Sequence, residues 1–268
     1  MNKKLPTYFV SHGGGPWPYM DGAFRANFNL LEASLKGIAA ELGEKPRAVL
    51  MISGHWEDRG FAVMSSPRPP MIYDYGGFPA HTYEVVYPAP GDPALAARVK
   101  QLIEGAGLPS RLDAGRGFDH GAFSTLVPMY PAADVPVVQV SLQQGYDAAA
   151  HLALGRALAP LREEGVLIIG SGLSYHNLRA FGTAGAAASA QFGQWLDAAM
   201  ELPDEARSQA LLDWTQAPAA RVAHPHEDHL VPLMVAVGAA EGERSERIYH
   251  ETAFMGGITV SSYRLGEL

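Results

Sequence analysis

Histidine is the residue whose abundance and spacing in this chain suggest chemistry. The 268 residues include ten histidines and no cysteine. Without cysteine the chain can form no disulfide, no thiolate nucleophile, no iron–sulfur cluster and no cysteine-type zinc site. Any metal must therefore be held by nitrogen and oxygen ligands, and the neutral imidazole of histidine is a common ligand of zinc and iron. The first question is which of the histidines could meet at one ion.

Three histidines follow short apolar runs that are rich in β-branched residues. His12 and His55 each come two residues after such a run, and His176 follows a third through a Gly-Ser-Gly turn. The runs span residues 7–10, 48–53 and 166–169. They are too short for helices and continuous rather than alternating, which predicts strands that are buried on both faces. Because ligands bind outside the carboxyl ends of strands in open α/β sheets, these histidines would converge if their strands were parallel neighbours.

A fourth histidine has a comparable place at a helix start. His229 directly precedes residues 230–237, an apolar stretch with helical spacing, and could enter the same crevice from there. A single histidine is more often a hydrogen-bonded structural residue than a ligand. Four at comparable positions lead us to predict a metal site formed by His12, His55, His176 and His229.

The other histidines are expected to play smaller parts. His151 lies in a predicted helix and is expected on the protein surface. Four more are expected in solvent or beside the metal site: His81, His224, His226 and His250. The sequence therefore divides its histidines into a candidate site and a remainder.

The elements that must position these residues alternate between strands and helices. Further strands are predicted at residues 61–65 and 135–142 from their continuous apolar character. Helices are predicted from apolar spacing at four places, namely residues 30–42, a segment opened by Asp92 and Pro93, a segment near Asp147, and residues 184–200. This alternation predicts an α/β fold, a single domain over residues 1–268 with a central, largely parallel or mixed sheet flanked by helices.

Two segments depart from the alternation. Residues 66–91 hold six prolines and several tyrosines, which predicts a long structured loop at the surface. Loops of that length in compact domains are usually functional or disordered, and the aromatic content favours function. Residues 253–265 read as a closing hairpin that turns at Gly256 and Gly257.

Composition and charge limit the possible partners. The chain carries 28 acidic against 20 basic residues, a formal net charge of −8, and has no run rich in Lys or Arg. This argues against nucleic acid or an anionic membrane as the main partner. A hydrophobic content of 47% rules out intrinsic disorder. No stretch approaches the roughly 20 apolar residues of a membrane span, and a cytoplasmic location is the default expectation.

Short motifs in a fixed order give the sequence a family resemblance. The motifs are SHGG at 11–14, SGHW at 53–56, YDYGGFP at 73–79, YPAPG at 87–91, GFDHG at 117–121, MYP at 129–131, HNLR at 176–179 and residues 224–232. Together they resemble the class III extradiol ring-cleavage dioxygenases, in the branch similar to DOPA 4,5-dioxygenase. Two motifs differ from the family's frequent forms: Gly14 stands where serine is common, and Gly54 where alanine is common.

The resemblance implies a site and an activity. By it, His12, His55 and His229 match metal-binding histidines, and His176 matches either a further ligand or an acid/base residue. His120 matches a residue that faces the substrate, and we take His176 and His120 as the catalytic candidates. The implied cofactor is a non-haem Fe(II), with Zn(II) found in some members as isolated. The implied substrates are a small aromatic diol and O2, the product is a ring-opened semialdehyde, and a homo-oligomer is possible.

Two other functions remain open. A zinc-dependent hydrolase or amidase could use the same histidines, with a metal-bound water as nucleophile. A Memo-like protein could keep the pocket for binding alone, although retained His176 and His120 argue for proton chemistry. Oxygen uptake separates the dioxygenase from both alternatives.

Overall fold

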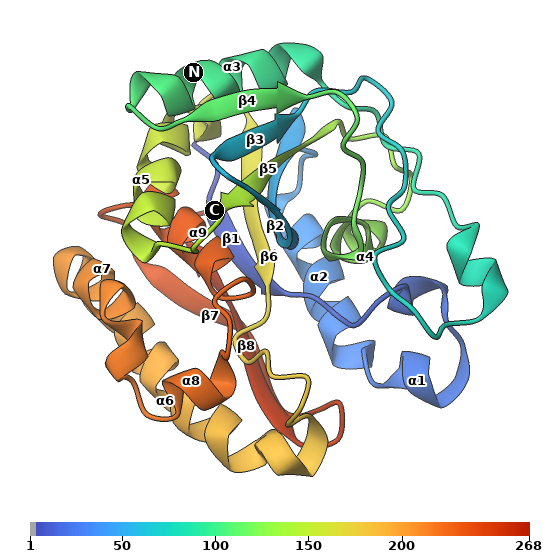
Figure 1. Ribbon diagram of the computed structural model, residues 1–268, viewed down its shortest axis with the longest axis vertical. Coiled ribbons are helices and arrows are strands. Elements are labelled where there is room, and N and C mark those ends of the chain that lie inside the picture. The colour runs from blue at the N-terminus through green and yellow to red at the C-terminus, as the bar shows by residue number, and fades with distance from the viewer. Residues whose placement is uncertain (1–3) are drawn as a thin grey trace.

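One mixed β-sheet organises the fold (Figure 1). The computed structural model describes residues 4–268. The strands are β1 (Thr7–Ser11), β2 (Ala48–Asp58), β3 (Phe61–Met64), β4 (Ser110–Asp113), β5 (Val137–Gln143), β6 (Val166–Gly172), β7 (Ser245–Phe254) and β8 (Ile258–Leu265). Within the described range they form one eight-stranded sheet in the order β4-β3-β5-β2-β6-β1-β8-β7.

The central strands β5, β2, β6 and β1 run parallel to one another. Strand β8 pairs antiparallel with β1, and β7 pairs antiparallel with β8. The sheet is therefore mixed, which confirms the predicted α/β fold. Because β2, β6 and β1 are adjacent and parallel, their carboxyl ends meet at one edge of the sheet. This is the condition on which the convergence of the histidines depended.

Helices cover both faces of the sheet. They are α1 (Gly22–Ala26), α2 (Asn29–Leu42), α3 (Pro93–Gly105), α4 (His120–Met129), α5 (Ala148–Leu158), α6 (Ala186–Glu201), α7 (Asp204–Leu212), α8 (Ala220–Ala223) and α9 (Val231–Ala239). Figure 1 shows α2 and α4 on one side of the strands and α5 and α9 on the other. None of the helices in residues 4–268 combines the length and the apolar character that a membrane span needs.

The central strands are buried on both faces, as their continuous apolar runs predict. Alternate residues of β2 join different clusters: Val49 and Met51 pack with α2 and α4, whereas Leu50 and Ile52 pack with α3 and α5. This follows from the two-residue period of side chains along a strand. The sheet is thus fixed from both sides, and its carboxyl edge is a rigid support for a site.

The predicted helix ends agree with the structure. Asp92 and Asp147 cap α3 and α5, and their carboxylates accept hydrogen bonds from Leu95 N at 2.8 Å and Ala150 N at 2.7 Å. Gly43 ends α2 with φ 70°, a conformation that glycine adopts without strain.

Some boundaries differ from the predicted ones. Strand β2 does not end at residue 53; it continues to Asp58 through a register shift between Ile52 and Glu57, so His55 lies within the strand. Strand β4 and most of β7 were not predicted, because both lie at the edges of the sheet, are largely exposed and lack an apolar run. The predicted hairpin turn at Gly256 and Gly257 is present.

Glycines in β6 let the segment before α9 approach the sheet. A Cβ atom on Gly172 would overlap the carbonyl oxygen of His229, and one on Gly170 would overlap that of Pro232. A hydrogen bond from Leu173 N to His229 O at 3.0 Å stabilises this contact between the two backbone segments. Strand β6 therefore places His229 directly above the carboxyl edge of the sheet.

Candidate metal centre and active site

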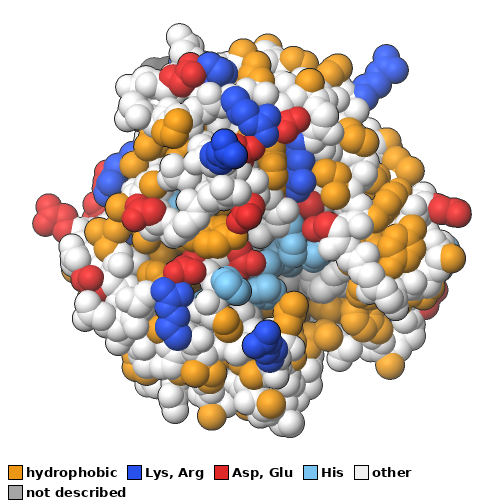
Figure 2. Space-filling model, viewed as in Figure 1, with side chains coloured by type: hydrophobic (Ala, Val, Ile, Leu, Met, Phe, Trp, Pro, Cys, Tyr) orange, Lys and Arg blue, Asp and Glu red, His pale blue; other side chains and the backbone are white. Residues whose placement is uncertain are grey.

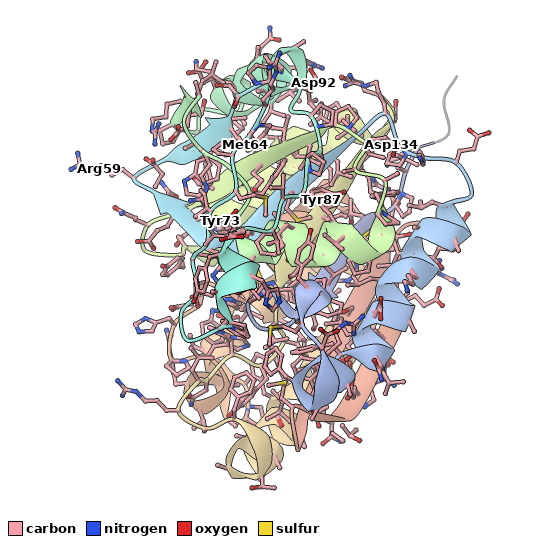
Figure 3. All side chains as sticks on the ribbon, turned by 90° about the vertical axis from the view of Figure 1, so that its right-hand side faces the viewer. Arg59, Met64, Tyr73, Tyr87, Asp92 and Asp134 are labelled. Atoms are coloured by element: carbon pink, nitrogen blue, oxygen red, sulfur yellow. The ribbon has the colours of Figure 1, made fainter. Side chains whose placement is uncertain are left out.

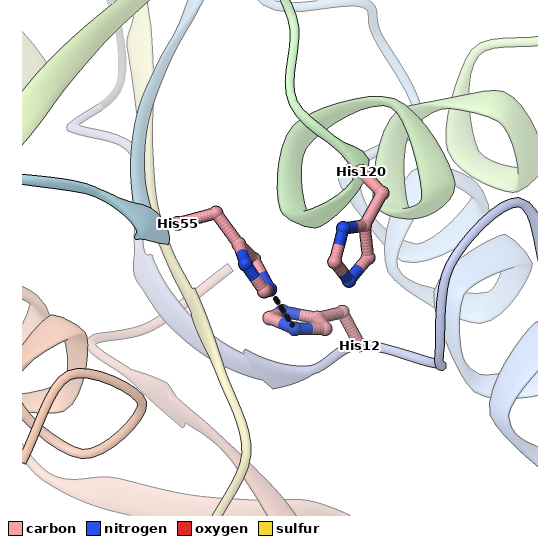
Figure 4. Close-up of side chains that lie close together, drawn as sticks. All are labelled: His12, His55 and His120. Carbon is pink, nitrogen blue, oxygen red and sulfur yellow. Dashed lines mark hydrogen bonds between the residues drawn. The ribbon is translucent and has the colours of Figure 1, made fainter. Parts of the chain in front are cut away.

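Three of the predicted histidines bring their Nε2 atoms together at the carboxyl edge of the sheet. His55 Nε2 lies 3.1 Å from His12 Nε2 and 3.0 Å from His229 Nε2. His12 follows β1, His55 lies near the end of β2, and His229 is held against β6. His12 and His229 are buried. Figure 4 shows the rings of His12 and His55 facing each other.

These contacts fit a site for one metal ion. Two imidazole nitrogens that each lie about 2.1 Å from one ion, with an angle near 90° between them, are about 3.0 Å apart. Within residues 4–268 the hydrogen-bond partners of these Nε2 atoms are the Nε2 atoms of the neighbouring histidines and include no oxygen. Nitrogen donors of this kind suit Fe(II) and zinc.

The protonation of the three rings also suits metal binding. Burial, reinforced by the neighbouring histidines, lowers the pKa of His12 and His229 well below the usual value. Burial and the charge of His120 lower the pKa of His55 to about 4. The rings are therefore neutral at neutral pH, which is the form that offers a lone pair to a metal.

Ser171 fixes which nitrogen of His12 carries the proton. The Ser171 hydroxyl donates to Gly121 O at 2.7 Å, so it can only accept from His12 Nδ1, 3.0 Å away. The proton of His12 accordingly sits on Nδ1 and the lone pair on Nε2 faces the centre. Partners of this kind orient metal-binding histidines and set their tautomer.

His120 approaches the same centre from α4. Its ring centroid lies 3.8 Å from that of His55, and one nitrogen from each of His12, His55 and His120 lies within 4.8 Å of the others. Figure 4 shows the His120 ring on the open side of the pair formed by His12 and His55. Helix α4 starts at His120, where the Asp119 carboxylate caps the helix by accepting from Ala122 N at 3.1 Å.

Asp74 orients His120 from the long loop. One carboxylate oxygen, Oδ1, accepts hydrogen bonds from His120 Nδ1 at 2.8 Å and His120 N at 3.1 Å. The other oxygen lies 3.4 Å from His55 Nδ1. Burial alone would raise the pKa of Asp74, but the hydrogen bond from His120 and the charges of His120 and His55 lower it. Because Nδ1 of His120 is hydrogen-bonded to this ionised carboxylate, the other ring nitrogen, Nε2, is free to face the cavity.

His176 stacks on His229 instead of facing it. The two ring centroids are 3.4 Å apart and the planes differ by 13°. His176 Nδ1 lies 3.9 Å from Asp228 Oδ1, and His176 lines the same cavity as the other histidines. Burial lowers the pKa of His176 below its usual value. One ligand atom from each of His176, Asp228 and His229 lies within 4.8 Å of the others, so these residues form a second group that could hold a metal ion.

A cavity of about 480 Å³ opens above the histidines. That volume lies in the range of small-molecule sites, about 300–1,000 Å³. His12, His55, His120, His176 and His229 form its polar end, and apolar side chains form most of the rest. Figure 2 shows the histidines at the floor of a hollow, with hydrophobic side chains along part of its border.

The long loop of residues 66–91 forms one side of this cavity through Asp74 and Phe78. Tyr73 and Tyr87, labelled in Figure 3, fix the loop: Tyr73 Oη donates to Val85 O and Tyr87 Oη donates to Tyr130 O, both at 2.9 Å. The loop is therefore ordered by its own tyrosines, in agreement with the prediction of a structured segment.

Comparison with known proteins decides the family. The pattern described as the catalytic LigB subunit of aromatic ring-opening dioxygenase matches residues 6–266. The chain is 40% identical to the 4,5-DOPA dioxygenase extradiol of Beta vulgaris, over 96% of this chain and 95% of that one. It is 33% identical to the protein of the same name from Escherichia coli K12, over 98% and 95%.

The chain belongs to the LigB family of aromatic ring-opening dioxygenases.

Two further relatives agree with this assignment. The dioxygenase tasH of Hapsidospora irregularis is 35% identical over 97% of this chain and 85% of its own length. The crystal structure of an uncharacterized Escherichia coli K12 protein superposes with a TM-score of 0.80 at 30% identity, covering 98% of this chain and 100% of that one. The predicted membership of the class III extradiol dioxygenases is confirmed, and with it the enzyme class.

Two further histidines of this dioxygenase are buried, and one of them, His151, lies elsewhere than predicted. His151 is not on the surface: it is fully buried, its Nε2 accepts from Gln143 N at 3.2 Å, and its Nδ1 lies 2.7 Å from Asp147 O. His224 is also fully buried, with Nε2 3.0 Å from Ser174 O. His151 was misjudged because helical spacing alone does not reveal which face a neighbouring strand will cover. His224 is one of the residues expected in solvent or beside the candidate site, and it follows Ala223, whose carbonyl oxygen accepts from His176 N at 3.0 Å.

Two carboxylates of the dioxygenase site were missed in the sequence. Asp74 and Asp119 each lie inside a motif that carries the family resemblance. Asp119 is fully buried and accepts hydrogen bonds from Ser53 Oγ at 2.7 Å and Gln139 Nε2 at 2.9 Å, and it pairs with Arg116. An acidic residue flanked by aromatic or histidine residues in an otherwise apolar motif was the available signal.

Proposed function

We propose that the protein opens a catechol-type aromatic ring with O2 by extradiol cleavage, giving a ring-opened semialdehyde. The observation that carries the proposal is the position of His55 Nε2, which lies 3.1 Å from His12 Nε2 and 3.0 Å from His229 Nε2 at the floor of a mainly apolar cavity. We propose these three residues as the metal ligands and residues 1–268 as one catalytic domain. The names of the relatives support the same reaction class.

The proposed cofactor is Fe(II), with Zn(II) as an alternative occupant in isolated protein. When bound, Fe(II) supplies the redox chemistry with O2 and the Lewis acidity that a metal-free protein lacks. Three neutral nitrogen donors on one side leave the cavity side open for the substrate. His176 was included among the predicted ligands, and its stacking on His229 favours a role beside the ion.

We propose that His120 handles the proton of a substrate hydroxyl. The Asp74 carboxylate accepts from His120 Nδ1, so Nε2 carries the lone pair and can take up a proton from the cavity. The same carboxylate stabilises the imidazolium that results, and the proton can later return to a product oxygen. His176, on the opposite side of His229, is the second candidate for proton transfer.

The loop of residues 66–91 would keep water from the ring. Phe78 lines the cavity, and its ring centroid lies 5.6 Å from that of Phe24 and 5.5 Å from that of Tyr75. Aromatic side chains that interlock in this way cover an apolar ligand without competing for the metal. Protection of this loop from proteolysis by a catechol analogue would support the role.

The test is oxygen consumption by metal-loaded protein. Protein that is reconstituted anaerobically with Fe(II) should consume one O2 per molecule of catechol or 4-methylcatechol and form a yellow product. Protein loaded with zinc serves as the control and should consume none. Absence of oxygen uptake with every catechol tried, despite stoichiometric iron, would contradict the proposal, and anaerobic ester or amide hydrolysis would then favour the hydrolase.

A further inference from the structure

The part of the cavity that lies beyond the histidines is built from apolar side chains of separate segments. Leu178 and Phe181 come from the loop after β6, Phe254 is the last residue of β7, and Met255 lies in the turn between β7 and β8. Met255 holds a positive φ of 47°, a conformation that is costly for a residue with a side chain and that is often found at functional sites. The wall is therefore assembled by tertiary structure around an apolar space.

This wall offers no partner for a charged substituent. Among the described residues that line the cavity, Asp74 is the one charged side chain apart from the histidines, and neither Lys nor Arg lines it. Asp74 is already engaged by His120 and His55. A carboxylate or ammonium group that enters such a space loses water and gains no opposite charge, which is unfavourable. Arg179 is exposed and lies outside the lining.

The cavity also has room for more than one ring. A Cβ atom on Gly14 would meet no heavy atom within 4 Å, so the backbone there borders open space. Leu178 lines the cavity while 75% of its surface is exposed. An exposed leucine is ordinary by itself, but one at the mouth of an apolar cavity is positioned to be covered by a ligand.

We propose that the substrate of this protein is a catechol with an uncharged, apolar substituent, alkyl or aryl, which packs against Leu178, Phe181 and Met255. The inference rests on the proposed ring-opening function and adds the chemical class of the substituent. It also separates this chain from an enzyme that prefers a catechol amino acid, whose carboxylate and ammonium groups would enter the apolar space without partners.

The test compares three catechols that differ in charge at the same place. They are 4-propylcatechol, 3-(3,4-dihydroxyphenyl)propanoate and DOPA, with unsubstituted catechol as reference. We expect kcat/KM for oxygen uptake to be about tenfold or more higher for 4-propylcatechol than for either charged compound, because an unpaired charge in an apolar site is costly. Equal or better turnover of a charged compound would overturn the inference.

Binding provides a readout that does not depend on turnover. Isothermal titration of the zinc-loaded protein should give the same order of affinities for the three compounds. If iron-loaded protein turns over no catechol at all but binding still favours 4-propylcatechol, the proposed reaction fails and the substituent inference stands. If catechol is cleaved but the charged compounds bind as well as 4-propylcatechol, the substituent inference fails and the proposed reaction stands.

A charge placed at the cavity mouth should change the preference. Leu178→Arg should improve kcat/KM for the propanoate relative to 4-propylcatechol by about tenfold, because it provides the missing opposite charge. Leu30→Arg is the matched control, since Leu30 is also exposed but lies in α2 outside the cavity, and it should leave the ratio unchanged. Arg179→Ala should likewise leave the ratio unchanged. An unaltered ratio in Leu178→Arg, or a shift in Arg179→Ala, would contradict the placement of the substituent.

Discussion

Buried histidines occur in two kinds of region of the molecule, and their ring nitrogens have different partners in each. In the centre formed by His12, His55 and His229, the Nε2 atoms face one another. In His151 and His224, ring nitrogens face backbone groups of Gln143, Asp147 and Ser174. Burial lowers the pKa in both regions. Burial and a low pKa therefore do not distinguish the proposed metal ligands from the other buried histidines, whereas the partner of each nitrogen does.

Removal of one facing histidine should have the largest effect. His55→Ala should lose its stoichiometric metal, and its rate of oxygen uptake should fall at least about 100-fold. Replacement of a residue that only supports a metal ligand already lowers metal affinity or activity by about 10–100-fold. Elemental analysis and an oxygen electrode measure both. His224→Gln is the control from the other region and should keep the metal. Full metal occupancy in His55→Ala would remove the distinction between the two regions.

Replacement of His120 should separate proton transfer from metal binding. His120→Ala should keep its metal and lose about 10²–10⁴-fold in kcat, the usual contribution of a general acid or base. Metal content and kcat are to be measured on the same preparation. An empty site in this variant would mean that His120 belongs with the ligands, a result that its closeness to His12 and His55 makes worth testing.

Asp74→Asn should have a smaller effect, about 10–100-fold in kcat, because Asp74 acts through His120. The decisive measurement is the double variant. If Asp74 works only by orienting His120, adding Asp74→Asn to His120→Ala should cause little further loss. If Asp74→Asn lowered kcat in the double variant by as much as it does alone, Asp74 would have a role that is independent of His120.

The buried histidines outside the facing group should affect how the stability of the protein depends on pH. Burial lowers the pKa of His224 to about 3, and in the unfolded chain it titrates near 6.5. Below pH 6.5 the unfolded state therefore binds the extra proton, and the free energy of unfolding falls with pH by about 1.4 kcal/mol per unit from this residue. The loss continues down to the folded pKa and is absent above pH 6.5.

Urea unfolding of metal-free protein between pH 7 and pH 5 measures this slope. His224→Gln keeps a side-chain donor for Ser174 O but does not titrate, so its slope should be shallower than that of the wild type by about 1.4 kcal/mol per pH unit below pH 6. The histidines of the proposed metal centre are present in both proteins, so the difference between the two slopes reports mainly on His224. Identical slopes would show that His224 is not held neutral by burial.

The sequence predicted the parallel centre of the fold and the floor of the site for a common reason. Strands buried on both faces must be continuous apolar runs, and a residue that follows such a run must lie at its carboxyl end. The places of His12, His55 and His176 follow from that rule. Strand β4 and most of β7 could not be predicted by this rule, because exposed edge strands have no continuous apolar run.

The walls of the site could not be predicted in the same way. Phe24, Phe78, Phe181 and Met255 come from segments that are far apart in the chain and whose approach depends on tertiary packing. Asp74 contacts His120 across 46 residues, a pairing that no local spacing encodes. The sequence thus predicted the histidines that project from the carboxyl edge of the sheet. It did not predict the side chains that loops bring to the site.

The position of β6 between β1 and β2 has a consequence for how the protein is made. Strands β1 and β2 are synthesised early, yet neither pairs with the other; each pairs with β6, which is made more than a hundred residues after β2. Until then their edges are open to wrong partners. The residue that completes the facing histidines, His229, emerges later still. The group of facing histidines is therefore incomplete in any chain that is truncated before His229.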